Sequence, residues 1–400
     1  MEIYFDNAAT TPVSQTARDA MMVALTEEYG NPSSLHRKGV SANERLEEAR
    51  ASIAKDLNAD PGEIYFTSGG SEADNWAITR AAELGARRGK KHIISTAFEH
   101  HAVLHTLKKL EKQGFEVTLL PVHEDGLVRV EEVEAALRED TALVTIMYAN
   151  NEVGTIQPIP QIGALCRARR IPFHTDAVQA VGHIPVDVKA DQVDYLSLSG
   201  HKFHGPKGVG VLYCRRGMYL TNLIEGGAQE RGKRAGTEAL PNILGMAAAL
   251  HESVEHMEEN IKKVTALRNK LIDGLRPIPA SYVNGDLTHR VPGNVSMCFE
   301  GVEGESLLLR LDLAGIYASS GSACTSGSLE PSHVLLSIGL PVEVAHGSLR
   351  LSLSEWNTEE EVDEVLKQLP EIVYSLRQMS PVWEDMLAEG KVQNVVMEEQ

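Results

Sequence analysis

From residue 45 to about residue 250, short apolar runs alternate with stretches whose apolar residues have helical spacing. Such an alternation predicts an α/β domain with a largely parallel central sheet flanked by helices. In sheets of this kind, functional residues gather at the carboxyl ends of the strands. The strand-like runs are residues 63–69, 91–97, 115–122, 142–150, 171–177, 193–200 and 208–214, and the helical stretches include 71–84, 102–113 and 162–169.

The pattern changes after Pro241. A long helical stretch at 243–275 is followed by apolar runs at 294–301 and 348–354 and by helical patterns near 305–313 and 358–378. A chain of 400 residues is long for one hydrophobic core, so we expect two domains. We expect a large domain at 15–255 and a smaller α+β domain formed by 1–14 and 256–400.

Charge and composition argue against several classes of protein. The formal net charge of −18 argues against nucleic acid as the main partner. We expect no membrane span, because no apolar run reaches about 18 residues, and a cytoplasmic protein, because no basic leader follows Met1. The four cysteines (Cys166, Cys214, Cys298 and Cys324) lack CxxC spacing, which favours free thiols in a reducing compartment. The first three stand in apolar patterns, so packing is their expected role.

The segment TSGGSEADN at 67–75 joins a strand-like run to a helical stretch through two glycines. Backbone N–H groups at a helix start bind anions, and glycines let a phosphate come close. Ser71 is also suited to cap the helix, with Asp74 three residues further on. The segment fits either a phosphate site at Gly70 and Ser71 or a plain capped helix.

Two later strand ends carry ionisable groups. In HTDAVQ (174–179), Asp176 follows an apolar run and precedes Gln179 by three residues. A buried carboxylate needs a cationic or N–H partner, so Asp176 is either a helix cap or the partner of a protonated cofactor ring. In SLSGHKFHGPKG (197–208), a lysine near a cleft floor could attack carbonyl carbons. We favour Lys202 over Lys207, which stands in a Gly-Pro turn, and an ion-pairing lysine is the alternative.

The histidines of AFEHHAVLHT (97–106) allow two interpretations. His101 and His105 are four residues apart and could share a metal, but no third-ligand pattern accompanies them, so we expect no metal. His100, at the predicted strand-to-helix junction, could stack on a flat ligand. An anion cradle, an acid for a ring nitrogen and a Schiff-base lysine are the parts that a pyridoxal phosphate (PLP) site requires.

Nine segments, in order along nearly the whole chain, carry a resemblance to the cysteine desulfurases of the NifS/IscS type. The resemblance implies PLP fold type I, in the class V aminotransferase superfamily. The closing SPVWEDM (380–386) is similar to the IscS branch, whose tail contacts a scaffold protein. The segments are YFDNAATTP (4–12), GNPSSLH (30–36), TSGGSEADN, EHHAV (99–103), NNEVG (150–154), HTDAVQ, SGHKFHGPKG (199–208), GGAQERGKRAGT (226–237) and SSGSACTSGSLEPSHVL (319–335).

The resemblance also implies roles for individual residues. Lys202 would hold PLP as a Schiff base and move protons at the substrate Cα, and Asp176 would keep the pyridine nitrogen protonated. His100 would stack on the ring and act in acid–base steps, and Gln179 would hydrogen-bond the ring's phenolate oxygen.

Other residues would hold the phosphate and the substrate. Thr237 would reach the phosphate in the neighbouring subunit, which implies a homodimer with shared sites. Arg350 would hold the substrate carboxylate, for which a planar guanidinium is well suited, and Asn151 would contact both cofactor and substrate. The phosphate ligands would be Gly70, Ser71, Ser199 and His201.

Cys324 stands in SSGSACTSGS (319–328), a segment rich in serine and glycine that we expect to form a mobile loop at about 319–330. The resemblance implies that Cys324 takes the sulfur of L-cysteine as a persulfide, with L-alanine as the other product. The sulfur would pass to an acceptor, such as an iron–sulfur scaffold protein, in whose complex Cys324 could also ligate a cluster. A tolerated surface thiol is the alternative for Cys324. For the whole chain, the alternatives are an aminotransferase or selenocysteine lyase of the same fold, or a binding protein that has kept the fold.

Overall fold

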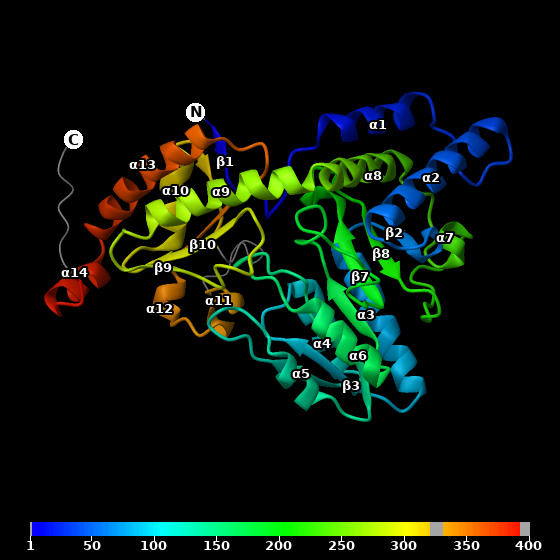
Figure 1. Ribbon diagram of the computed structural model, residues 1–400, viewed down its shortest axis with the longest axis horizontal. Helices are drawn as coiled ribbons and strands as arrows, with labels where there is room; N and C mark the ends of the chain where they lie inside the picture. Colours follow the sequence, from blue (N-terminus) through cyan, green and yellow to red (C-terminus); the bar gives the residue numbers. More distant parts are fainter. Residues whose placement is uncertain (1, 321–330, 393–400) are drawn as a thin grey trace.

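The computed structural model describes residues 2–320 and 331–392. It consists of two packed parts, and helices α8 (Leu240–Glu255) and α9 (Met257–Leu275) run from one part into the other (Figure 1). The larger part contains a seven-stranded sheet, and the smaller part contains a three-stranded sheet.

The large sheet has the strand order β2-β8-β7-β6-β5-β3-β4. Only β8 runs antiparallel to its neighbours, β2 and β7, and all other neighbouring strands are parallel. The predicted α/β fold with a mostly parallel sheet is therefore confirmed. The strands are β2 (Ile64–Thr67), β3 (His92–Thr96), β4 (Glu116–Leu120), β5 (Thr141–Thr145), β6 (Phe173–Asp176), β7 (Tyr195–Ser199) and β8 (Gly210–Cys214).

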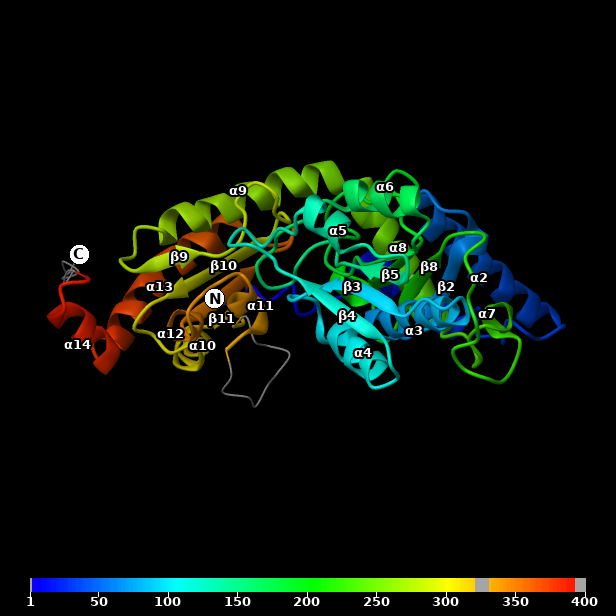
Figure 2. The same cartoon turned by 90° about the horizontal axis from the view of Figure 1, so that it is seen from below.

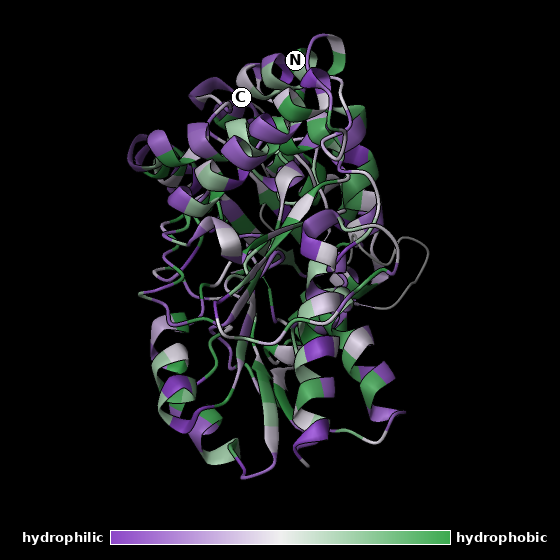
Figure 3. Cartoon of the chain, turned by 90° about the vertical axis from the view of Figure 1, so that its right-hand side faces the viewer, coloured by the Kyte–Doolittle hydropathy of each residue, from purple (hydrophilic) through white to green (hydrophobic). Residues whose placement is uncertain are grey.

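Helices cover both faces of this sheet. Successive strand residues point to opposite faces, so Ile93 packs with α3 (Gly70–Arg87) and α4 (His101–Glu111), whereas Ile94 belongs to the core on the other face. That second core includes residues of α1 (Gln15–Thr26), α2 (Arg37–Asp56), α5 (Val130–Ala136), α6 (Ile159–Arg169) and α8. Figure 3 shows mostly hydrophobic strands between helices banded in both colours, as expected for helices with one buried face.

The smaller part has an antiparallel sheet of strand order β12-β10-β9, which lies beside α9 (Figure 2). Strand β1 (Ile3–Tyr4) pairs with β11 (Ile316–Tyr317), so the N-terminal strand joins this C-terminal part. The other elements are β9 (Ser281–Val283), β10 (Asn294–Phe299), β12 (Ser348–Ser352), α10 (Gly304–Leu313), α11 (His333–Ser337), α12 (Val342–Ala345), α13 (Glu359–Arg377) and α14 (Pro381–Ala388), and α7 (Gln229–Gly232) belongs to the larger part.

The long helix predicted at 243–275 is two helices. Helix α8 ends at Glu255, and α9 begins at Met257 after His256, whose φ of −98° and ψ of 9° are not helical. The buried residues of α8 belong to the core of the large sheet, whereas those of α9 belong to the core of the smaller part. The break lets each helix turn its apolar face to its own core.

Three cysteines are buried, as predicted: Cys166, Cys214 and Cys298. Burial raises the pKa of their thiols to about 12, 12 and 11, so these thiols stay protonated. Within residues 2–320 and 331–392, no helix is long and apolar enough to cross a membrane.

Candidate functional site

A cavity of about 270 Å³ lies at the carboxyl ends of the central strands. Among the residues singled out from the sequence, Thr237 is exposed and does not line the cavity, and Cys324 lies outside the described residues. The residues that do line it are Gly70, Ser71, His100, Asn151, Asp176, Gln179, Ser199, His201, Lys202 and Arg350.

The sheet explains why residues from distant segments meet there. Asp176 and Ser199 are the last residues of β6 and β7, and Lys202 ends the short 3-10 turn that follows β7. His100 is the N-cap of α4, shortly after β3. Because β3, β6 and β7 run in the same direction, their carboxyl ends lie along one edge of the sheet.

Lys202 reaches into the cavity from this turn. Its Nζ donates hydrogen bonds to the carbonyl oxygens of Ala8 and Ala9, at 2.6 and 2.8 Å. The competing candidate Lys207 is exposed and does not line the cavity. The geometry therefore favours Lys202 as the reactive lysine.

The start of α3 has the backbone arrangement that an anion cradle needs, but Ser71 does not cap the helix. The N-cap is Gly69, without a side-chain capping hydrogen bond, and Ser71 lies in the first turn. The first N–H groups of a helix lack partners within the helix, so this end of the 18-residue helix suits an anion. A Cβ on Gly70 would lie only 2.6 Å from Cγ2 of Val178, so glycine allows the close packing here.

Asp176 is only 5% exposed, and its Oδ1 accepts a hydrogen bond from the Val178 N–H at 3.0 Å. Burial and then the neighbouring Asp74 raise its pKa to about 7. A protonated ring nitrogen would supply the positive charge that this buried carboxyl needs in order to ionise.

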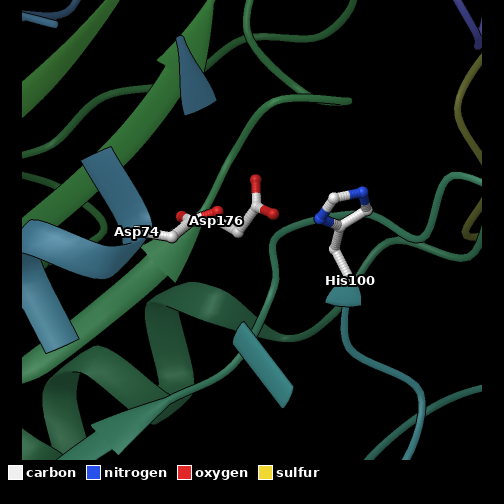
Figure 4. A group of neighbouring side chains, drawn as sticks. All are labelled: Asp74, His100 and Asp176. Atoms are coloured by element: carbon white, nitrogen blue, oxygen red, sulfur yellow. The ribbon is translucent and has the colours of Figure 1, made fainter. Parts of the chain in front are cut away.

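His100 lies across a gap from Asp176 (Figure 4). One nitrogen of His100 and one oxygen each of Asp74 and Asp176 lie within 4.8 Å of one another. The three donors could also hold a cation, but a lysine and an anion cradle in the same cavity suit a phosphate-bearing ring better. His100 Nδ1 accepts a hydrogen bond from the Ala102 N–H at 3.1 Å, and burial lowers the pKa of the ring, which therefore stays neutral near pH 7.

Arg350 lines the cavity from β12 of the smaller part. It is 3% exposed, and its Nη2 lies 2.9 Å from the Asp6 carboxylate while its Nη1 donates to the Asn151 carbonyl oxygen at 3.0 Å. Its buried Nε has no hydrogen-bond partner among the described residues. The guanidinium thus retains donors for a carboxylate in the cavity.

Sequence reasoning missed several lining residues. Ala8 and Ala9 stand in the segment YFDNAATTP, which contributed to the resemblance without an assigned role. Asp74 was noted only for its spacing from Ser71. The other residues that were missed are Met147, Ala149 and Val178.

The residues present fit PLP. The N-terminal end of α3 suits the phosphate of PLP, Asp176 suits its ring nitrogen, and Lys202 suits its carbonyl carbon. His201 also stays neutral, because burial lowers its pKa to about 4, and its Nδ1 lies 3.1 Å from Thr10 Oγ1. The other ring nitrogen can then carry the proton and donate to a phosphate oxygen.

Comparisons with known proteins agree with this site. Residues 3–365 match the family model of the class-V aminotransferases. The chain is 52% identical over 389 residues to a cysteine desulfurase IscS of Clostridium botulinum, covering 96% of this chain and 98% of the relative. It is 53% identical over 380 residues to a cysteine desulfurase IscS of Methanosarcina thermophila, covering 95% and 94%. A solved NifS-like protein superposes with a TM-score of 0.88 at 43% identity, covering 93% of this chain and 99% of that one. The chain therefore belongs to the aminotransferase class-V family, within its cysteine desulfurases.

Proposed function

We propose that this protein is a PLP-dependent cysteine desulfurase, which converts L-cysteine to L-alanine and passes the sulfur on as a protein-bound persulfide. One observation carries the proposal: Lys202, Asp176, His100 and the start of α3 surround a single cavity that Arg350 also enters. This arrangement gives each part of PLP and of an amino acid substrate a chemically suitable partner.

The bound cofactor supplies an electron sink for bonds broken at the substrate. Asp176 holds a proton at the ring nitrogen, and the N–H groups at the start of α3, with Ser71, Ser199 and His201, hold the phosphate. Lys202 would hold the cofactor through its carbonyl carbon and would move a proton at the substrate Cα.

Arg350 and Asn151 bind the substrate carboxylate. The burial of Arg350 strengthens a charge-assisted hydrogen bond, and its pairing with Asp6 fixes the plane of the guanidinium. Gln179 lines the cavity, and its Nε2 donates to the Ala8 carbonyl oxygen at 2.9 Å. Its second N–H would be suited to the phenolate oxygen.

The sulfur acceptor within the chain is Cys324, which the structure does not describe. Its thiolate forms an S–S bond with the substrate sulfur as the substrate C–S bond breaks. The electron pair of that bond stays with the carbon skeleton, which takes up a proton and leaves as alanine. The neutral ring of His100 is suited to take the thiol proton at Nδ1, once that nitrogen releases the Ala102 N–H.

Partners follow from the same proposal. The persulfide passes to an acceptor protein for iron–sulfur cluster assembly, and α14 with the residues beyond it contacts a scaffold. The exposed Thr237 contributes to the site of a second subunit in a homodimer. The buried free thiols suit a reducing cytoplasm.

We also propose that residues 15–255 form one domain, and that 1–14 and 256–400 form the other.

Turnover of L-cysteine with a reductant tests the function. Alanine and sulfide should appear in equal amounts. Lys202→Ala should stop turnover and prevent borohydride from trapping the cofactor on the protein, whereas Lys207→Ala should retain both properties. Conversion of the cofactor to pyridoxamine phosphate without sulfide would indicate an aminotransferase, and a strong preference for selenocysteine would indicate a lyase. Trapping on another lysine in Lys202→Ala would refute the assignment of Lys202.

A further inference from the structure

Asp74 is a second carboxyl group at the base of the cofactor cavity. It lies one turn into α3, lines the cavity and is only 1% exposed. Its Oδ1 is buried without a hydrogen-bond partner among the described residues. Figure 4 shows its carboxyl group beside that of Asp176. We call Asp74 and Asp176 the carboxyl pair.

The groups behind Asp74 do not supply a positive charge. His174 Nε2 lies 3.5 Å from Asp74 Oδ1 and 3.0 Å from Ser197 Oγ, and His174 Nδ1 lies 2.8 Å from Thr145 Oγ1. Burial lowers the pKa of His174 to about 4, so its ring is neutral near pH 7. Hydroxyl and neutral imidazole groups can hydrogen-bond a carboxyl but cannot neutralise a carboxylate.

Two buried carboxyls this close cannot both be ionised without a cation. Burial is the main cause that raises the pKa of each to about 7, and the charge of Asp74 raises that of Asp176 further. The other titratable groups around the pair are His100, Glu99 and Lys202. Glu99 is itself fully buried, with a pKa raised to about 8 by burial, so it adds no negative charge near neutral pH.

We propose that the carboxyl pair shares one proton, and that Asp74 keeps this proton while Asp176 ionises to receive the N–H⁺ of the cofactor ring. Asp74 is then a positioning residue that acts through Asp176. Below the titration range of the pair both carboxyls are protonated, so binding of a protonated ring must release the Asp176 proton to solvent. Asp74 is neutral when Asp176 ionises, and its O–H can donate to the Asp176 carboxylate, so Asp176 would ionise at higher pH if residue 74 had no donor. The inference rests on PLP as the cofactor, but not on desulfuration.

The first test is the affinity of apoenzyme for deoxypyridoxine phosphate, measured from about pH 5.5 to 8. This analogue keeps the ring nitrogen and the phosphate but lacks the aldehyde, so it does not react with Lys202. Wild-type affinity should rise with pH, by at most about tenfold per pH unit, until Asp176 is ionised. Asp74→Asn, which has the same shape and is neutral at every pH, should follow the wild-type curve, whereas Asp74→Leu, which offers no donor, should show this rise at higher pH. Asp74→Leu should therefore bind several-fold more weakly than wild type at about pH 6, and the difference should shrink towards pH 8.

A matched control lies on the same helix. Glu83 forms a surface ion pair with Arg80, at 2.7 Å, and does not line the cavity. Glu83→Gln should therefore follow the wild-type curve. An Asp74→Asn curve shifted to lower pH would overturn the proposal, because it would show that Asp74 is charged when Asp176 ionises. An Asp74→Leu curve that superimposes on that of the wild type would also overturn it.

A second measurement needs no variant and decides the matter if Asp74→Asn does not fold. Calorimetry in buffers of different ionisation enthalpy counts the protons released on binding. At about pH 6, wild-type apoenzyme should release more protons with deoxypyridoxine phosphate than with benzyl phosphate, which has no ring nitrogen. Equal release with the two ligands would overturn the proposal. Neither measurement involves sulfur chemistry, so a failed desulfurase assay would leave both results interpretable.

Discussion

Arg350→Lys should impair the use of cysteine while leaving the cofactor bound. A guanidinium has five N–H donors, and its contacts to Asp6 and Asn151 use two, so a forked pair remains for a carboxylate. A lysine ammonium offers one point of contact and loses at least one charge-assisted hydrogen bond, worth about 1.5–3 kcal/mol. Because about 1.4 kcal/mol corresponds to a factor of ten, kcat/KM should fall roughly 10- to 150-fold.

The assay is alanine formation as a function of cysteine concentration, together with cofactor absorbance to verify occupancy. Binding of cysteamine, which lacks the carboxylate, should change little in the variant. Arg377→Lys is a matched control, because Arg377 is also a buried arginine of the smaller part (4% exposed) with hydrogen bonds to backbone carbonyls. An unchanged kcat/KM for cysteine, or an equal loss for cysteamine binding, would refute the reasoning.

Three further predictions concern stability and the sulfur step. Arg50→Met should destabilise the fold by about 3–5 kcal/mol in urea unfolding, because it leaves the Glu230 carboxylate, 2.8 Å from Arg50 and 2% exposed, buried without a positive charge and with the Phe66 N–H as its remaining donor. A loss below about 1 kcal/mol would contradict this. Burial raises the pKa of Glu355, but the hydrogen bond and charge of His204 outweigh burial and lower this pKa to about 2. The pair therefore stabilises the folded protein above the ordinary pKa of a glutamate, and this stabilisation is lost as pH falls from about 5 towards 2. Thermal melts of Glu355→Gln should thus depend less on pH in that range, and parallel curves would argue against the pair. Cys324→Ala should retain PLP but lose sulfide formation, and full activity would exclude a role for that thiol.

The sequence was sufficient to predict the features that local patterns encode. The alternation of strands and helices predicted the parallel sheet, and Asp176 and Lys202 could be singled out because Asp176 ends a buried strand and Lys202 stands just after one. The turn before Lys207 correctly indicated exposure. The break at His256 was not predictable, because neither glycine nor proline stands there and the break depends on which core each helix packs against.

Contacts between distant segments could not be predicted from the sequence, for a different reason. Asp6 and Arg350 are 344 residues apart, and neither residue's surroundings in the sequence reveal the other. The charge state of Asp74 depends on burial beside Asp176, which spacing along one helix does not report. Every residue has a backbone carbonyl, so the residue types of Ala8 and Ala9 do not reveal that their carbonyls accept hydrogen bonds from Lys202.

The N-terminal segment explains how two parts of the chain make one site. Within four consecutive residues, Asp6 pairs with Arg350 of the smaller part, and the carbonyls of Ala8 and Ala9 accept hydrogen bonds from Lys202 of the larger part. The segment also follows β1, which is anchored to the smaller part through β11. Arg350 and Lys202, which we propose to bind the substrate carboxylate and the cofactor, are therefore held at a fixed separation by one short stretch of backbone. A change in the packing of β1 should consequently alter substrate affinity, even though β1 itself does not line the cavity.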